Sequence, residues 1–135
     1  MYRPLTDEGH RRAGELAELL AEEAIGRILS SPATRCAQTL GPIAHNRGVE
    51  IEECQELWEG SDIDEAMALL ARHGAEGVVA CSHGDIIPAI IERLGDTGVP
   101  VQGRGCELGS IWVLDHDGSN WTGAHYVGRK ATSLA

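Results

Sequence analysis

Apolar positions recur at helical spacing in several stretches of the chain. The clearest stretch, Asp7 to Ala24, carries Ala and Leu every three or four positions, with Thr6 as a capping residue and Gly26 as a stop. The same periodicity predicts three later helices, which begin at Ser31-Pro32, at Ser61 and at Asp85. The second of these has Ile63, Ala66, Met67 and Leu70 on one face, and the last is expected to run to Leu94.

Short apolar runs between these helices predict β-strands. Arg27 to Ser30 is one, and Gly77 to Ser82 is expected to be buried on both faces. Val49 to Cys54 alternates apolar and acidic residues, as a strand near a sheet edge does. Ser110 to Leu114 and Trp121 to Tyr126 predict a hairpin around Asp117-Gly118-Ser119, after a loop from Asp96 to Gly109.

This alternation of strands and helices predicts one α/β domain over residues 1–135 with a mainly parallel sheet. We expect a flexible tail over residues 128–135.

Charge and composition narrow the possible partners. Eleven Lys and Arg against 21 Asp and Glu give a formal net charge of −10, which argues against nucleic-acid and anionic-membrane partners. No apolar run approaches the ~20 residues of a membrane span, and the first ten residues carry no apolar signal-peptide core. We therefore expect a cytoplasmic protein.

The four cysteines are widely spaced and form no CxxC pair, so free thiols are expected rather than a disulfide framework. The alternative is a metal site, and with it a metal-dependent hydrolase, because the chain also has six histidines. Because the close ligand pairs of a zinc site are missing, we expect no metal.

Two strand-to-helix turns carry the polar groups that suggest chemistry. Ser30 to Arg35 places a guanidinium in the first turn of a helix, where free backbone N–H groups already favour an anion. Cys81 to Asp85 places His83 at the end of the buried strand. In a parallel sheet both turns lie at the carboxyl edge, where ligands bind. Taken singly, Arg35 is equally explained as a surface arginine and His83 as a hydrogen-bonded turn residue.

The ordered motifs of the chain resemble the histidine phosphatase superfamily, the phosphoglycerate-mutase-like proteins. Ser31-Pro32-Ala33-Thr34-Arg35-Cys36-Ala37-Gln38-Thr39 is similar to the family's S-P-x-x-R-x-x-Q-T segment, and Ser82-His83-Gly84 resembles its second histidine motif. Arg3-Pro4-Leu5-Thr6-Asp7-Glu8-Gly9 looks like the R-P-L-T-x-x-G opening of SixA-type phosphohistidine phosphatases, and Gly109 to Leu114 like the last-strand segment. The whole run is also similar to the phosphatase domain that follows a Nudix domain in some actinobacterial MutT-type proteins.

The resemblance implies a three-layer α/β/α sandwich and a phosphate site without metal or cofactor. By the same resemblance Arg35 clamps phosphoryl oxygens, His83 stabilises the transferring group, and Glu59 donates a proton to the leaving group. Without the family, Glu59 is explained as a solvated carboxylate in an acidic segment. The implied partners are phosphate, a phosphorylated small molecule or a phosphoprotein.

The chain departs from the family at its nucleophile. The family's R-H-G strand precedes R-P-L-T, whereas only Met1 and Tyr2 precede Arg3, so we expect the first strand and its histidine to be missing. Arg72-His73-Gly74 spells the same tripeptide, but it ends a helical pattern and fits a helix C-cap.

Two accounts of this departure stay open: a shortened form of an active phosphatase, and a pseudophosphatase that keeps an anion pocket for binding. A non-enzymatic interaction module is the competing class of function. Because a missing central strand exposes backbone edges, we also expect self-association, as a homodimer, through an exposed sheet edge.

Overall fold

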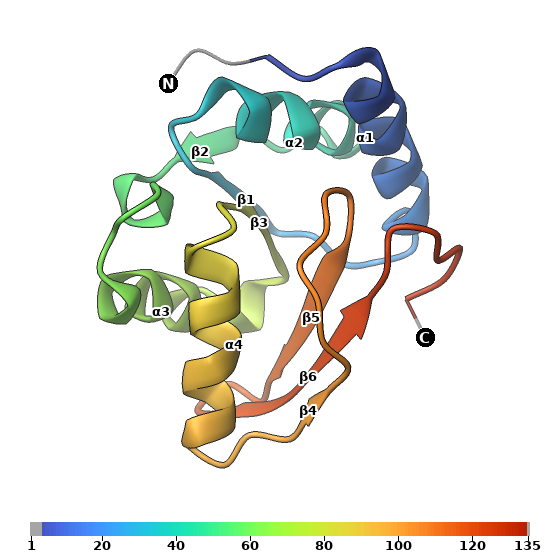
Figure 1. Cartoon of the computed structure of the whole chain (residues 1–135). Coiled ribbons are helices and arrows are strands. Elements are labelled where there is room, and N and C mark those ends of the chain that lie inside the picture. The colour runs from blue at the N-terminus through green and yellow to red at the C-terminus, as the bar shows by residue number, and fades with distance from the viewer. Residues whose placement is uncertain (1–3, 135) are drawn as a thin grey trace.

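The computed structural model, shown in Figure 1, describes residues 4–134. Its helices are α1 (Asp7–Leu19), α2 (Thr34–Arg47), α3 (Ile63–Arg72) and α4 (Ile86–Asp96), with two single 3₁₀ turns, η1 (Gln55–Leu57) and η2 (Gly74–Glu76). Its strands are β1 (Arg27–Ser30), β2 (Ile51–Glu53), β3 (Val78–Cys81), β4 (Val101–Gln102), β5 (Ile111–His116) and β6 (Trp121–Val127). Arg3 of the R-P-L-T match and the two residues before it lie outside the described part.

The strands form two separate three-stranded sheets. The first has the order β2-β1-β3 and is parallel throughout, with Ser30 opposite both Glu53 and Cys81. The second has the order β4-β6-β5, in which β4 runs parallel and β5 antiparallel to β6. The prediction of an α/β fold with a mainly parallel sheet is confirmed, and so is the predicted hairpin. Within residues 4–134 no strand precedes α1.

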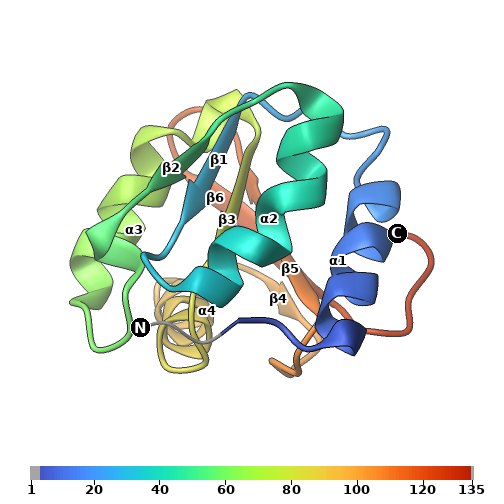
Figure 2. The ribbon, with the colours of Figure 1, turned by 90° about the horizontal axis from the view of Figure 1, so that it is seen from above.

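Helices cover both faces of the first sheet (Figure 2). Successive side chains of β1 point to opposite faces: Ile28 packs with α1 and α2, whereas Leu29 packs with α3 and α4. The cluster around Leu29 also includes Ala124 of β6, with Trp112 and Leu114 of β5 against it. This cluster of side chains therefore joins the two sheets, which share no strand pairing in the described residues.

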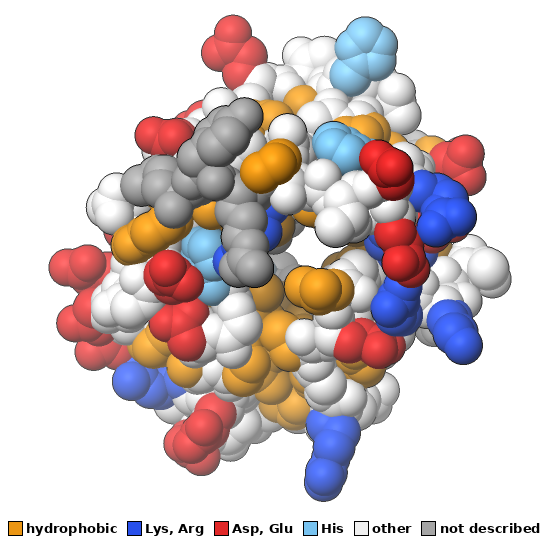
Figure 3. Space-filling view, turned by 45° about the horizontal axis from the view of Figure 1, so that its top comes forward, with side chains coloured by type: hydrophobic (Ala, Val, Ile, Leu, Met, Phe, Trp, Pro, Cys, Tyr) orange, Lys and Arg blue, Asp and Glu red, His pale blue; other side chains and the backbone are white. Residues whose placement is uncertain are grey.

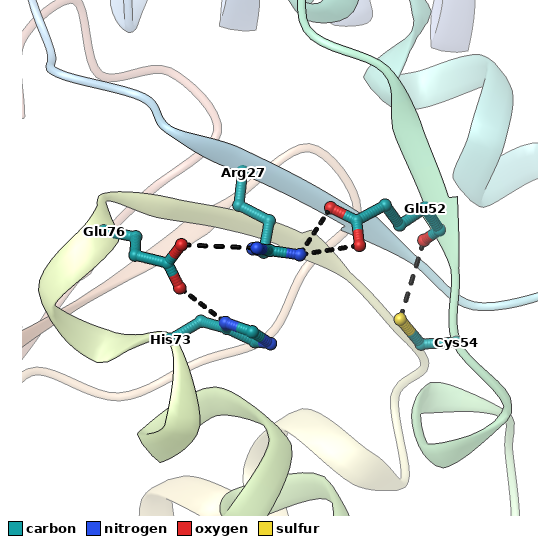
Figure 4. A network of polar contacts seen from close by, with 5 residues as sticks. All are labelled: Arg27, Glu52, Cys54, His73 and Glu76. Carbon is teal, nitrogen blue, oxygen red and sulfur yellow. Dashed lines mark hydrogen bonds and ion pairs between the residues drawn. The ribbon is translucent and has the colours of Figure 1, made fainter.

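A polar network ties the amino ends of the first sheet together (Figure 4). The Arg27 guanidinium donates to both carboxylate oxygens of Glu52 on β2, at 2.8 and 3.0 Å, and to Glu76 of η2 at 3.3 Å. Glu76 in turn binds Nδ1 of His73, the C-cap residue of α3. The Arg72-His73-Gly74 tripeptide is thus a helix end, as predicted, and it precedes β3 while His83 follows it.

Three helix boundaries differ from the prediction. α1 ends at Leu19 rather than Ala24, and the Arg47 guanidinium from α2 donates to the carbonyls of Leu20, Ala21 and Glu23 just beyond its end. Asp62, not Ser61, caps α3 through a bond from the amide of Asp64. α2 begins at Thr34, and Ser31 serves the neighbouring turn instead of capping the helix. Thr6 caps α1 as predicted.

The predicted double-sided burial of β3 is wrong. Ala80 is exposed and the other three residues are only half-buried, because β3 pairs with β1 alone and is an edge strand in the described part. β2 lies at the opposite edge, as its alternation predicted. The predicted loop from Asp96 to Gly109 contains the two-residue strand β4. In the tail, Arg129 pairs with Glu8 of α1.

No helix within residues 4–134 has both the length and the apolar character needed to cross a membrane.

Candidate functional site

The two polar turns singled out from the sequence lie side by side. β1 and β3 are paired in parallel with Ser30 opposite Cys81, so both strands end at the same edge of the sheet. The amide of Ser31 then donates to the carbonyl of Cys81 at 3.0 Å, and this hydrogen bond joins the two segments where the strands end. Figure 3 shows an opening near the centre of the face that comes forward when the top of Figure 1 is turned toward the viewer.

His83 is the centre of this site. His83 is 6% exposed, and its Nε2 lies 2.7 Å from the Ser31 hydroxyl. The edge of the ring meets Trp58, with ring centroids 5.3 Å apart and planes at 81°. Contacts on two sides therefore fix the imidazole, and the Ser31 hydroxyl also accepts the amide of Ala33 at 3.3 Å.

Charges on three neighbouring side chains act on His83. Burial lowers the pKa of His83 below its ordinary value, and the positive charge of Arg35 lowers it further. Glu59 and Asp85 oppose this effect, because their negative charges favour the imidazolium. The net effect is a lowered pKa, which favours the neutral imidazole over the imidazolium.

Arg35 stands in the first turn of α2, half-buried. In the described residues its guanidinium has no hydrogen-bond or ion-pair partner. The first backbone N–H groups of a helix also lack partners inside the helix. An anion at this point would meet an unpaired guanidinium and a helix N-terminus together.

Glu59 is exposed and lies on the segment Leu57–Gly60, which passes over the turn after β3. The Ser82 hydroxyl donates to the carbonyl of Leu57 at 2.6 Å, and the Asp85 carboxylate accepts the amide of Gly60 at 2.7 Å. The structure thus brings Arg35, His83 and Glu59 to one place.

Sequence reasoning gave Ser31, Trp58, Ser82 and Asp85 no role in the site, although Ser31 and Asp85 were expected to begin helices. Ser31 and Ser82 lie inside the motifs already quoted, and Asp85 directly follows one of them. The partners of all four residues are 25 or more positions away in the sequence, so the pattern did not indicate these contacts.

The other described histidines lie away from His83. His10 and His45 are in α1 and α2, and His73 belongs to the network of Figure 4. His116 ends β5, with its ring against Trp121, and His125 binds the carbonyl of Leu134 at 2.7 Å. No group of three potential metal ligands is gathered among residues 4–134.

All four cysteines are free thiols, as expected. Two of them lie beneath the site: the Cys36 thiol is 3.7 Å from the carbonyl of Ser82 and contacts Cys81. The hydrogen bond with Cys81 lowers the pKa of Cys36, and the same contact raises the pKa of Cys81 together with burial.

Comparison with known proteins agrees with this geometry. Residues 3–61, which include Arg35, Ser31 and Glu59, match the model of the histidine phosphatase superfamily, branch 1. A structure described as a SixA phosphohistidine phosphatase from Nakamurella multipartitia superposes with a TM-score of 0.65 at 28% identity, over 83% of this chain and 72% of the other. The chain is therefore similar to the histidine phosphatase superfamily, in sequence over residues 3–61 and in fold over most of its length.

Two further proteins show the same similarity. A SixA from Agrobacterium tumefaciens superposes with a TM-score of 0.60 at 26% identity, over 70% of this chain and 64% of the other. An 8-oxo-(d)GTP phosphatase of Mycolicibacterium smegmatis is 27% identical over 133 residues, which is 93% of this chain. The chain spans only 41% of the length of that curated relative. Its fold is the phosphoglycerate mutase-like sandwich expected of a SixA-type member.

Proposed function

We propose that this chain binds the phosphoryl group of a phosphomonoester or a phosphohistidine at the edge formed by the ends of β1 and β3. The observation that carries the proposal is the convergence of the Arg35 guanidinium, which has no polar partner in the described residues, and the buried His83 imidazole on one edge of a parallel sheet. A phosphorylated small molecule or a phosphoprotein would supply the ligand.

Each group has a role that its surroundings support. The Arg35 fork suits two phosphoryl oxygens, and its charge compensates the charge that develops during transfer. His83 offers a ring nitrogen to the same group. Glu59 is free to donate a proton to the leaving oxygen or nitrogen, since its carboxylate makes no hydrogen bond in the described residues.

Covalent transfer needs a nucleophile in line with the phosphorus atom. Within residues 4–134, His83 is the single histidine at this site. We therefore propose that residues 4–134 supply a phosphate-binding frame that by itself hydrolyses esters poorly or not at all. A pseudophosphatase that binds phosphate without cleaving it is the alternative function, and the same frame supports it.

Titration with inorganic phosphate, followed by NMR of the His83 imidazole, tests the proposal. We expect saturable binding by the native chain and at least a tenfold loss in Arg35→Ala, whereas the exposed Arg104→Ala variant should bind normally. If the native chain does not bind inorganic phosphate, the proposed phosphate site is wrong and the pocket is vestigial. Robust hydrolysis of p-nitrophenyl phosphate that is lost in His83→Ala but not in His73→Ala would refute our argument on the nucleophile.

As a partner we propose a second copy of the chain, paired through an exposed sheet edge. The support is the edge of β3 that pairs with no strand in the described residues, together with the exposure of Ala80 on this apolar strand. Light scattering should detect a dimer that Ala80→Lys disrupts, and a strictly monomeric native chain would contradict it.

A further inference from the structure

Asp85 occupies the N-cap of α4, yet its side chain does not cap that helix. An aspartate at this position ordinarily accepts an amide of its own first turn. Here the carbonyl of His83 accepts the amides of Ile86 at 3.1 Å and Ile87 at 3.0 Å instead. The Asp85 carboxylate reaches out of the helix and accepts the amide of Gly60 at 2.7 Å. The Asp85 carboxylate therefore holds a segment of the chain other than its own helix.

Ser82 acts on the same segment from the other side of His83. Its hydroxyl donates to the carbonyl of Leu57 at 2.6 Å, and Leu57 itself is fully buried in the core. The turn after β3 thus holds the segment at two points, Leu57 and Gly60. The two residues between them are Trp58 and Glu59.

The segment between these two points is a tight turn. The amide of Ser61 donates to the carbonyl of Trp58 at 3.1 Å, and Gly60 has a φ of 78°, which glycine adopts without strain. In such a turn a shift of the Gly60 amide moves Glu59 directly. Trp58 is meanwhile held edge-on to His83.

We propose that Asp85 and Ser82 are positioning residues, which fix Glu59 and Trp58 beside His83 by holding both ends of the turn that carries them. The proposal rests on the proposed function for the role of Glu59 as proton donor. Asp85 uses its carboxylate oxygen for this purpose, so an amide oxygen of the same reach can replace it. Its charge is a separate contribution, which acts on His83.

The test compares Asp85→Ala and Asp85→Asn by amide exchange at Gly60 and by nuclear Overhauser contacts between the Trp58 and His83 rings. Loss of one hydrogen bond, worth about 1 kcal/mol, should speed Gly60 exchange about fivefold to tenfold in Asp85→Ala. Asp85→Asn keeps an acceptor and should restore protection. Both variants should lower the pKa of His83, because each removes a negative charge that raises it.

Asp117→Ala is the matched control, because Asp117 also holds a turn through backbone amides, those of Ser119 and Asn120, but in the hairpin. It should leave Gly60 unchanged. Ser82→Ala should weaken the contacts between the two rings. If Asp85→Ala does not fold, Asp85→Ser replaces it, because a serine can cap α4 but is too short to reach Gly60.

Equal Gly60 exchange in the native chain and in Asp85→Ala overturns the proposal, as does a folded Asp85→Asn that exchanges like the alanine variant. A native chain that binds no inorganic phosphate overturns the proposed function instead. The exchange and ring-contact results then still decide whether Asp85 and Ser82 position the turn.

Discussion

Substitution of Ser31 by alanine tests whether this hydroxyl holds the His83 ring. Ser31 is 1% exposed, and its bond to Nε2 of His83 is 2.7 Å long, so the change leaves a buried ring nitrogen without its partner. Such a loss costs about 1–3 kcal/mol in the free energy of unfolding. With an unfolding entropy of about 2.1 cal/mol/K per residue, this corresponds to a fall in Tm of roughly 4–10 °C.

The neighbouring Ser30 provides the matched control. It is equally buried, but its hydroxyl donates to the carbonyl of Ser31 at 2.7 Å and does not contact His83. Ser30→Ala should lower stability by a comparable amount, since it too removes one buried hydrogen bond. Only Ser31→Ala should move the Nε2 resonance of His83.

Urea unfolding followed by circular dichroism gives the stability change, and long-range ¹H–¹⁵N correlation spectra report the imidazole nitrogens. A free energy of unfolding within about 0.5 kcal/mol of the native value in Ser31→Ala would refute the reasoning. An Nε2 resonance that Ser30→Ala shifts as strongly would also refute it.

Three further predictions concern stability. Because burial lowers the pKa of His83, the unfolded chain binds a proton at higher pH than the native chain does, so the free energy of unfolding should fall as the pH decreases below 6.5. Urea titrations of His83→Asn should lack that part of the slope, and an unchanged slope would contradict the shift. Leu29→Ala removes a side chain that is 1% exposed and should cost about 2–5 kcal/mol, while Leu108→Ala, at 89% exposed, should change little. Equal urea midpoints for the two would rule out our placement of the core. Gly77 has a φ of 74°, and an added Cβ would lie 2.1 Å from the carbonyl oxygen of Ala24, whereas Gly118 has a φ of 101° and open space. Gly77→Ala should therefore lower Tm well beyond Gly118→Ala, and a smaller effect would count against the close approach.

The sequence was informative where structure depends on neighbouring residues. Thr6 and the apolar spacing after it predicted the start of α1, and the turn residues from Asp117 predicted the hairpin. The parallel pairing of β1 and β3 was expected from their alternation with helices, and it brings Arg35 and His83 together. Local pattern and sheet topology were sufficient for these features.

Contacts between distant segments were not predictable in the same way. The carbonyls just beyond the end of α1 accept hydrogen bonds from Arg47, which lies 26 positions beyond Ala21. Asp85 was interpreted as the start of a helix, whereas its carboxylate serves Gly60. β4 has two residues, too few for any periodicity to appear. In each case the deciding partner is chosen by the folded arrangement and not by sequence spacing.

The division into two sheets has a consequence for how the molecule opens. Backbone hydrogen bonds cross from strand to strand within each sheet, whereas the described part of the chain has no strand pairing between the sheets, and side chains around Leu29 and Ala124 pack across the gap. Thermal fluctuations can separate the hairpin of β5 and β6 without breaking any strand pairing of β1, β2 or β3. The hairpin and β4 therefore form a candidate unit of low protection, while Arg35 and His83 remain attached to the more persistent half.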